Sequence, residues 1–354
     1  REFGSFDAST LDRKVERRIR LAEDRVDLND FFFGGLNKKM FDLEVEVEQL
    51  NLGVEKGGLT PLRLGGGMKK MPEKALPQGL DAKPFATVME NFFMAADPLA
   101  FLVTPTLDSA ANVYHTTPRL VLLPRQPNLS IYNDQIGGEL VLFRERADDA
   151  WPNKRSYGYS KNIISTSSLI DKMAENKATP DARMFLRARL LDLVLGDWDR
   201  HQDQWRWAEG NGDKEKMFFP IARDRDQVFS NFDGLFITAF RPYSINLLQL
   251  RKFDDKLTRD EIRWMHWKSS ILDNMILADL DENEWKSETN FMKSAITEDI
   301  VDKATTILPN SYEERKKVIN YNLNARMQNI DQISKDLRAE LLERSIIRGS
   351  NDKD

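Results

Sequence analysis

Apolar residues recur at helical spacing most clearly over residues 182–195, ARMFLRARLLDLVL. They cover a wide face, which predicts a helix in the interior of the fold, and Gly196 is typical of a residue that ends a helix. After about residue 245 the pattern is helical almost to the end of the chain, and residues 311–346 form long helical patterns rich in charge. This last part is expected to pack on the preceding core rather than to form a separate domain.

Two further helical segments are predicted in the amino-terminal third. Residues 9–28 are charged, good helix formers with few apolar positions, so we expect an exposed helix there. Residues 84–112 also look helical, with interruptions near Asp97-Pro98 and at Pro105, because proline removes a helical hydrogen bond and clashes with the preceding turn.

Short apolar runs and period-two alternation predict strands at residues 41–52, 120–123, 140–143, 205–208 and 217–221. Asn211-Gly212 lies between the last two and is a strong hairpin signal. Since strands and helices are mixed in the first part and only helices follow, the sequence predicts an α+β fold.

Composition narrows the possible functions. The 354 residues carry 52 Lys and Arg against 57 Asp and Glu, a net charge of −5, so a dedicated nucleic-acid-binding protein is not expected. The absence of cysteine excludes disulfides, thiolate nucleophiles and Cys-ligated zinc. The sequence has no run of about 18 apolar residues, so no transmembrane helix is predicted. The histidines are His115, His201 and His266, too few for a site built from several histidine ligands.

Acidic residues crowd two short segments, residues 197–203 and residues 223–226. The first follows the carboxyl end of an apolar helix, where the helix dipole disfavours anions, and a bound cation would offset this cost. On an extended strand Asp224 and Asp226 would share one face and the two arginines the other. Because the hairpin brings the segments together, Asp199 and at least one of these carboxylates are expected to share a pocket for Mg²⁺ or Mn²⁺.

Each of these signals has an ordinary structural alternative. Alternating Asp and Arg often form surface ion pairs, and His201 could orient its loop by hydrogen bonding or act as a general base. An EF-hand is excluded because Gln202 stands where its glycine is required. The glycines at 65–67 match neither a P-loop nor a dinucleotide fingerprint, and could bind phosphates or form a flexible turn.

The pattern Gly196-x-x-Asp199-x-His201, followed by a hairpin and Pro220-x-x-x-Asp224-x-Asp226, resembles the catalytic core of atypical protein-kinase-like families. These include the HipA-type toxin kinases, the CotH-type spore-coat kinases and the secretory-pathway casein kinase group. More narrowly, the chain resembles a kinase-like region of large bacterial surface proteins, mainly of Bacteroidetes, that also carry a calcineurin-like phosphoesterase region and an outer-membrane barrel. The matching segments are GDWDRHQDQWRW, FFPIARDRDQVF, DSAANVYHTTPRLVLLP and KMPEKALP.

This resemblance covers about residues 57–240 and implies roles for individual residues. Asp199 resembles the catalytic-loop Asp that orients or deprotonates the acceptor hydroxyl. Asp226, or Asp224, resembles the Asp that holds Mg²⁺ on the nucleotide phosphates. Gln204 stands where many such kinases have a metal-binding Asn, so it is the third candidate metal ligand, and its amide is longer.

The resemblance also implies a nucleotide site in the amino-terminal part. Arg63, Lys69 and Lys70 are the candidates for the cation that pairs with the phosphates, and Glu90 is the candidate for its ion-pair partner. The glycine triplet at 65–67 runs almost directly into the two lysines. A strand pair that the family has between these points is therefore missing here, which would weaken nucleotide binding.

At the level of the fold, the resemblance implies a bilobal protein-kinase-like fold with a small N-terminal lobe and a large helical C-terminal lobe. The corresponding regions are an N-terminal helix and strand extension (1–56), an N-lobe-like region (57–146), a region like the catalytic core (147–244) and a helical region packed on the core (245–354).

The function that the resemblance implies is phosphoryl transfer dependent on Mg²⁺ (or Mn²⁺) and ATP, with a nucleotide and an unidentified acceptor as partners. The alternative is a catalytically inactive pseudokinase-like interaction module of a bacterial surface protein. A metal-dependent phosphoesterase is a third hypothesis, which the small number of histidines disfavours. The surface-protein relatives imply a periplasmic or outer-membrane-associated location and linkage to an outer-membrane barrel.

Overall fold

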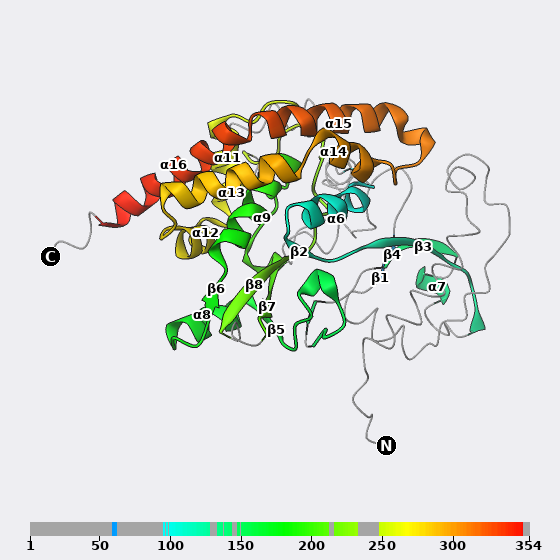
Figure 1. The fold of residues 1–354 in the computed structure, drawn as a ribbon. Coiled ribbons are helices and arrows are strands. Elements are labelled where there is room, and N and C mark those ends of the chain that lie inside the picture. Colours follow the sequence, from blue (N-terminus) through cyan, green and yellow to red (C-terminus); the bar gives the residue numbers. More distant parts are fainter. Residues whose placement is uncertain are drawn as a thin grey trace, which may run out of the picture. The chain divides into compact units, whose positions relative to one another are not determined.

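The computed structural model describes residues 59–61, 95, 97, 99–127, 133–136, 138–143, 147–148, 150–211, 216–232 and 248–349 (Figure 1). Contacts divide the chain into two units. The smaller unit comprises residues 1–93, 117–146 and 309–313, and the larger unit comprises residues 94–116, 147–308 and 314–354. The helix predicted at 9–28 and the strand predicted at 41–52 lie outside the described residues.

Three antiparallel strands form the sheet of the smaller unit, in the order β1-β4-β3. β3 (Arg119–Leu123) pairs along its whole length with β4 (Glu139–Phe143), and β1 (Leu59–Pro61) pairs with the other edge of β4. The same unit holds the one-turn helix α7 (Asn133–Ile136) and the 3-10 helix η8 (Asn310–Tyr312). The two strands predicted in this part are confirmed as β3 and β4.

The sheet of the larger unit is built around β8 (Met217–Ala222). β7 (Trp205–Glu209) pairs antiparallel with one edge of β8, and β5 (Ile163–Ser165) pairs antiparallel with β7. β6 (Thr179–Pro180) and β2 (Tyr114–His115) pair in parallel with the other edge of β8. The predicted hairpin is confirmed as β7 and β8, whereas strands of two or three residues are too short for a periodic pattern to reveal them.

Helix α9 (Ala182–Leu195) is the centre of the larger unit, as the sequence predicts. It begins at Asp181, whose carboxylate accepts a hydrogen bond from the Met184 backbone N–H. It ends at Gly196, which has a φ of +73°. No other residue type adopts this left-handed conformation as readily as glycine. Most of its side chains are buried, and Phe185 packs on the indole rings of the hairpin.

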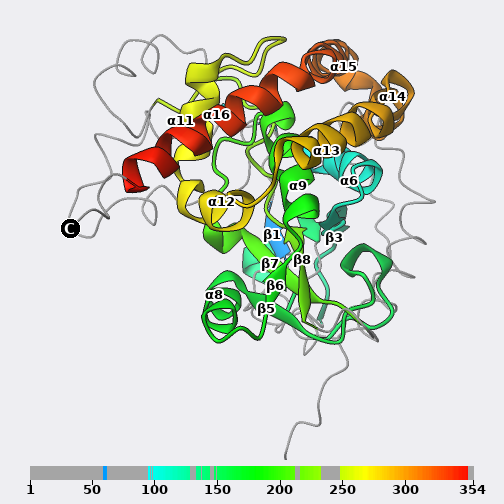
Figure 2. The ribbon, with the colours of Figure 1, turned by 60° about the vertical axis from the view of Figure 1, so that its left-hand side comes forward.

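The other helices in the described part of the larger unit are α6 (Ala100–Ala110), η3 (Arg155–Tyr157), α8 (Thr166–Ala174), η4 (Gln202–Gln204), α11 (Arg259–Trp267), α12 (Ser270–Leu277), α13 (Glu282–Ala295), α14 (Glu298–Thr305), α15 (Glu313–Gln328) and α16 (Ile330–Gly349). α12, α13 and α16 pack on α9, and α14 packs on α6 (Figure 2). The predicted helical part is therefore confirmed from α11 onward, and it packs on the core as expected.

The prediction that Pro105 interrupts its helix is wrong, because α6 continues through it. Proline leaves the carbonyl four residues earlier, that of Phe101, without its usual helical donor. The hydroxyl of Thr104 donates to that carbonyl at 3.4 Å. A neighbouring side chain therefore compensates for part of the missing hydrogen bond.

None of the helices in the described part of the chain combines the length and the apolar character needed to cross a membrane.

Candidate functional site

Two loops meet at one end of the β7–β8 hairpin. The helix loop, residues 196–204, connects α9 to β7, and the strand loop, residues 223–226, follows β8 directly. Trp205 and Ala222 form the last pair of the hairpin ladder. The ladder thus brings the end of the helix loop beside the start of the strand loop.

Hydrogen bonds extend this contact beyond the hairpin. The Arg223 backbone N–H donates to the Gln204 carbonyl at 3.1 Å. The Arg200 guanidinium donates to the Arg223 carbonyl at 2.5 Å and to the Gln204 carbonyl at 3.4 Å. The two loops are therefore bonded to each other at this end of the hairpin.

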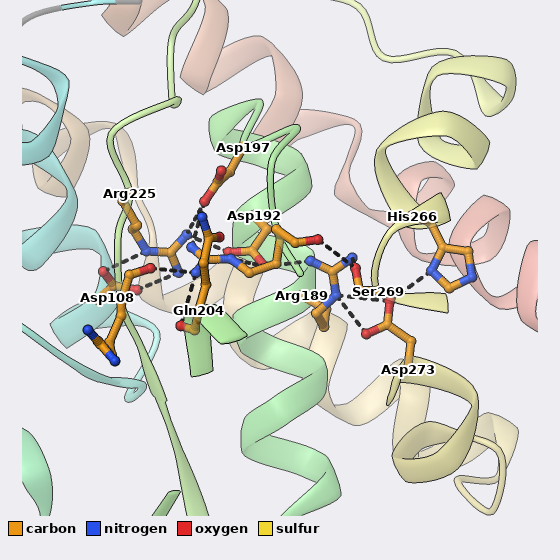
Figure 3. A network of polar contacts seen from close by, with 11 residues as sticks. Asp108, Arg189, Asp192, Asp197, Gln204, Arg225, His266, Ser269 and Asp273 are labelled. Carbon is orange, nitrogen blue, oxygen red and sulfur yellow. Dashed lines mark hydrogen bonds and ion pairs between the residues drawn. The ribbon is translucent and has the colours of Figure 1, made fainter. Parts of the chain in front are cut away.

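A buried polar network lies beneath the two loops (Figure 3). We call it the inner network; its members are Asp108, Arg189, Asp192, Asp197, Arg200, Arg225, His266, Ser269 and Asp273. At its centre the Asp192 carboxylate accepts hydrogen bonds of 2.5 Å from both Arg189 and Arg225 and lies 3.3 Å from Arg200 Nε. Burial alone would raise the pKa of Asp192, but the three guanidinium groups outweigh it and lower that pKa.

Arg225 joins the strand loop to this network. It donates two hydrogen bonds to the Asp108 carboxylate of α6, at 2.9 and 3.1 Å, besides its bond to Asp192. The expectation of extended backbone through residues 223–226 is wrong. β8 ends at Ala222 and Asp224 has a φ of +53°, so the strand alternation stops before Arg225. The buried carboxylates require a positive counter-charge. Placing Arg225 beside them stabilises the fold more than a longer β8 would.

Asp197 is the member of the network whose charge is least well compensated. One carboxylate oxygen, Oδ2, accepts a 2.5 Å bond from Arg200, whereas the other, Oδ1, is buried without a hydrogen-bond partner among the described residues. Burial raises the pKa of Asp197 to about 7, with Asp192 and Asp199 adding to the rise and Arg200 and Arg225 opposing it. The group therefore exchanges its proton near neutral pH.

The helical part closes the other side of the network. Arg189 donates to both oxygens of Asp273 at 2.9 and 3.0 Å and to the Ser269 hydroxyl at 2.8 Å. The Ser269 hydroxyl donates in turn to the Arg200 carbonyl at 3.2 Å. His266 contacts Asp273 at 2.7 Å through Nδ1. The segment between α11 and α12 is thus bonded to both α9 and the helix loop.

Asp199, the candidate acceptor-activating residue, lies outside the inner network. Its Oδ1 accepts a 2.6 Å hydrogen bond from the Lys268 ammonium. The same ammonium lies 5.2 Å from the centre of the Trp198 ring, a cation–π contact. The side chains of Asp199 and Lys268 are 27% and 35% exposed, respectively, so solutes can reach both.

His201, the second catalytic candidate, is half-buried at the start of η4. Its Nδ1 accepts from the Asp203 backbone N–H at 3.3 Å and lies 3.9 Å from the Asp203 carboxylate. This is the local contact that the structural alternative for His201 predicts.

The candidate metal ligands lie on both loops. Asp224 and Asp226 are half-buried in the strand loop. Gln204 is buried in the helix loop, and its Oε1 has no hydrogen-bond partner among the described residues. Within the described ranges no three His, Asp or Glu side chains are grouped so as to hold a metal ion. The candidate donors are therefore two carboxylates on the strand loop and one amide on the helix loop.

The candidate nucleotide-binding residues Arg63, Lys69, Lys70 and Glu90 lie outside the described residues, as does the glycine triplet.

Sequence reasoning missed Lys268 and most of the inner network. One signal was present: Arg189 and Asp192 are charged residues three apart within an otherwise apolar helix. Such a pair in a buried helix needs partners from other elements. Nothing local in the sequence indicates Lys268, because it is 69 residues from Asp199.

No protein-family model matches the chain, and no curated protein matches it either.

Proposed function

We propose that the chain is an atypical protein-kinase-like domain that catalyses phosphoryl transfer from Mg·ATP. The observation that carries the proposal is a difference in burial among the charged side chains of the two loops. Asp197, Arg200 and Arg225 are buried and bond the loops to the core, while Asp199, Asp224 and Asp226 are only half-buried. Carboxylates on rigidly joined loops are what positioning catalysis needs.

Phosphoryl transfer requires little covalent chemistry from the protein, so the arrangement of charges supplies most of the rate. In our proposal Asp199 accepts the proton of the acceptor hydroxyl. The strand loop supplies the carboxylates of Asp226 and Asp224, and Gln204 adds an amide oxygen. The two units, one with a small antiparallel sheet and one rich in helices, are compatible with a small and a large kinase lobe.

The donor set suits Mg²⁺. This ion takes oxygen ligands and is commonly bound by one or two carboxylates together with substrate phosphates. The unpaired Gln204 Oε1 supports the assignment, because a buried amide oxygen without a donor carries a desolvation cost that a cation would relieve. When bound, Mg²⁺ would neutralise phosphate charge.

The proposal is tested by calorimetric titration of Mg·ATP into the wild-type chain and three single-residue variants. Asp226→Asn should lose Mg²⁺-dependent ATP binding. Asp199→Asn should keep ATP binding and lose phosphoryl transfer by roughly 10²- to 10⁴-fold, measured as transfer of labelled phosphate to protein or water. Asp203→Asn is the matched control, because this carboxylate lies on the same helix loop and is 81% exposed; it should change neither property.

A pseudokinase-like interaction module is the second candidate, favoured by the bond between Asp199 and Lys268, which occupies the proposed base. This candidate predicts that ATP binds but that its phosphate is not transferred. Asp199→Asn would then change no activity, because the wild type has none. If ATP affinity were the same in all variants with and without Mg²⁺, or absent in all, the loops would be a structural acidic cluster and the kinase proposal would fail.

A further inference from the structure

We propose that Lys268, from the helical part of the chain, binds the terminal phosphate of the nucleotide beside Asp199. This inference rests on the proposed function and extends the site to a third segment of the chain. No sequence pattern singles out Lys268; its placement comes from its contacts with the helix loop.

Two contacts fix the ammonium next to the reacting group. Lys268 donates to Asp199 at 2.6 Å and lies over the Trp198 ring at 5.2 Å. Both partners belong to the helix loop, so the ammonium is held against the loop from two directions. A freely moving surface lysine would lose more side-chain entropy on binding an anion.

The backbone beneath Lys268 is fixed as well. Its neighbour Ser269 is buried and bonds to Arg189 and to the Arg200 carbonyl. The Ser269 backbone N–H donates to the His266 carbonyl at 3.1 Å. The inner network thus places Lys268 and Asp199 through the same set of buried bonds.

Lys268 differs from the other cations of the site in accessibility. Arg200 and Arg225 are at most 4% exposed in their side chains and are bonded to buried carboxylates. Lys268 is 35% exposed and ends in a compact ammonium that can exchange one oxygen partner for another. Among the described residues its carboxylate partner is Asp199, the group that the proposed reaction needs to be released.

The charge of the site gives the exchange a driving force. A terminal phosphate carries about −1.5 to −2 charges against the single charge of a carboxylate, so the Lys268 ammonium attracts it more strongly than it attracts Asp199. A terminal phosphate oxygen would take the place of Asp199 on Lys268, and Asp199 would then face the acceptor hydroxyl. In the transfer, the bond from the terminal phosphorus to the bridging oxygen of ADP breaks, a bond to the acceptor oxygen forms, and the acceptor proton goes to Asp199.

The test compares Mg·ATP with Mg·ADP, because only ATP has the phosphate that Lys268 is proposed to bind. Lys268→Met, measured by calorimetry, should weaken Mg·ATP binding by roughly tenfold to a hundredfold, as for loss of one charged hydrogen bond, and leave Mg·ADP binding within twofold. Lys268→Arg keeps the positive charge and should recover most of the ATP affinity. Melting curves of all variants verify that each one folds.

Lys293→Met is the matched control. Lys293 forms an exposed ion pair of 2.7 Å with Asp331, both side chains being about half exposed, and it has no bond to either loop. The Lys293→Met variant removes the same positive charge away from the two loops, so its affinities for ATP and ADP should both stay unchanged.

The outcomes separate this inference from the proposed function. If the wild type binds Mg·ATP and Lys268→Met binds it equally well, or loses ATP and ADP affinity alike, the role of Lys268 is overturned and the kinase proposal stands. If the wild type binds neither Mg·ATP nor Mg·tripolyphosphate, the role of Lys268 and the kinase proposal are both overturned. Selective loss of ATP affinity in Lys268→Met, with Lys293→Met unchanged, supports the assignment.

Discussion

Two arginine–carboxylate clusters of the larger unit use the same chemistry in opposite surroundings. In the inner network every side chain that bonds the loops to α9 is at most 4% exposed. In the outer cluster, Arg259 and Arg263 of α11 bond to Glu340 and Glu343 of α16. There only Glu340 is buried, and Glu343 is 53% exposed. The first cluster joins loops to the core, and the second joins two helices at the surface.

This difference decides what each cluster contributes. Water screens an exposed pair, and the entropy of ordering two long side chains offsets most of its attraction. A buried pair contributes little net stability when complete, yet removing one partner leaves an uncompensated charge. The inner network is therefore a constraint on geometry: it makes any other position of the helix loop and strand loop costly. The outer cluster has no comparable effect on the site.

The largest effect is expected from Arg225→Met, which leaves Asp108 and Asp192 short of hydrogen bonds. We expect a loss of about 3–5 kcal/mol in the free energy of unfolding, measured by urea denaturation. Arg259→Met in the outer cluster is the control and should barely move the urea midpoint. A similar response in both variants would mean that burial does not distinguish the clusters.

A large pH effect is expected from Asp197→Asn. Burial raises the pKa of the folded Asp197 to about 7 from an ordinary 3.8, so the folded state binds more protons between these values. The contribution of this group to stability is therefore greatest at low pH, falls as the pH rises toward 7, and is level above it. The fall amounts to a few kcal/mol.

Asn resembles the protonated carboxyl and does not titrate, so the variant should lack this fall. Relative to the wild type it should gain stability steadily from pH 4 to pH 7.5, as seen in urea midpoints measured across that range. If the difference between the two proteins did not vary with pH, Asp197 would be ionised throughout and fully compensated by its arginines.

The elements that sequence analysis predicted well are those fixed by local pattern. α9 matches its predicted range, ends at the predicted glycine, and is followed by the predicted hairpin. Because these two features also bring the helix loop beside the strand loop, the meeting of the two acidic segments was predictable as well.

Side-chain directions at the site were not predictable, because distant partners set them. Strand alternation could not show which groups Arg225 bonds, because its main partner Asp108 is 117 residues away in the sequence. The local pattern singled out Asp199, whereas Lys268, which bonds to it, lies in the turn between α11 and α12. Pro105 shows the same limit on a smaller scale, since a neighbouring hydroxyl compensates for a helix-breaking residue.

A moderate effect is expected from Ser269→Ala. The hydroxyl accepts a hydrogen bond from Arg189 and donates one to the Arg200 carbonyl, and both partners are buried. Losing it should cost roughly 1–3 kcal/mol in urea denaturation. Since Ser269 also fixes the backbone beside Lys268, the variant should weaken Mg·ATP binding more than Mg·ADP binding. Ser294→Ala, which removes an exposed hydroxyl on α13, is the control and should leave both measurements unchanged.

The smallest effect is expected in the outer cluster, from Glu343→Gln. Arg259 and Arg263 lose one partner but keep Glu340, and the mutated side chain remains in water. The melting temperature should therefore fall by less than about 2 °C. Raising the salt concentration to about 1 M should abolish even this difference, because it shortens the screening length to roughly 3 Å, whereas the loss caused by Arg225→Met should persist. A fall of 5 °C or more that resisted salt would show that the outer cluster behaves as a buried network, and the contrast between the two clusters would then lie in something other than exposure to water.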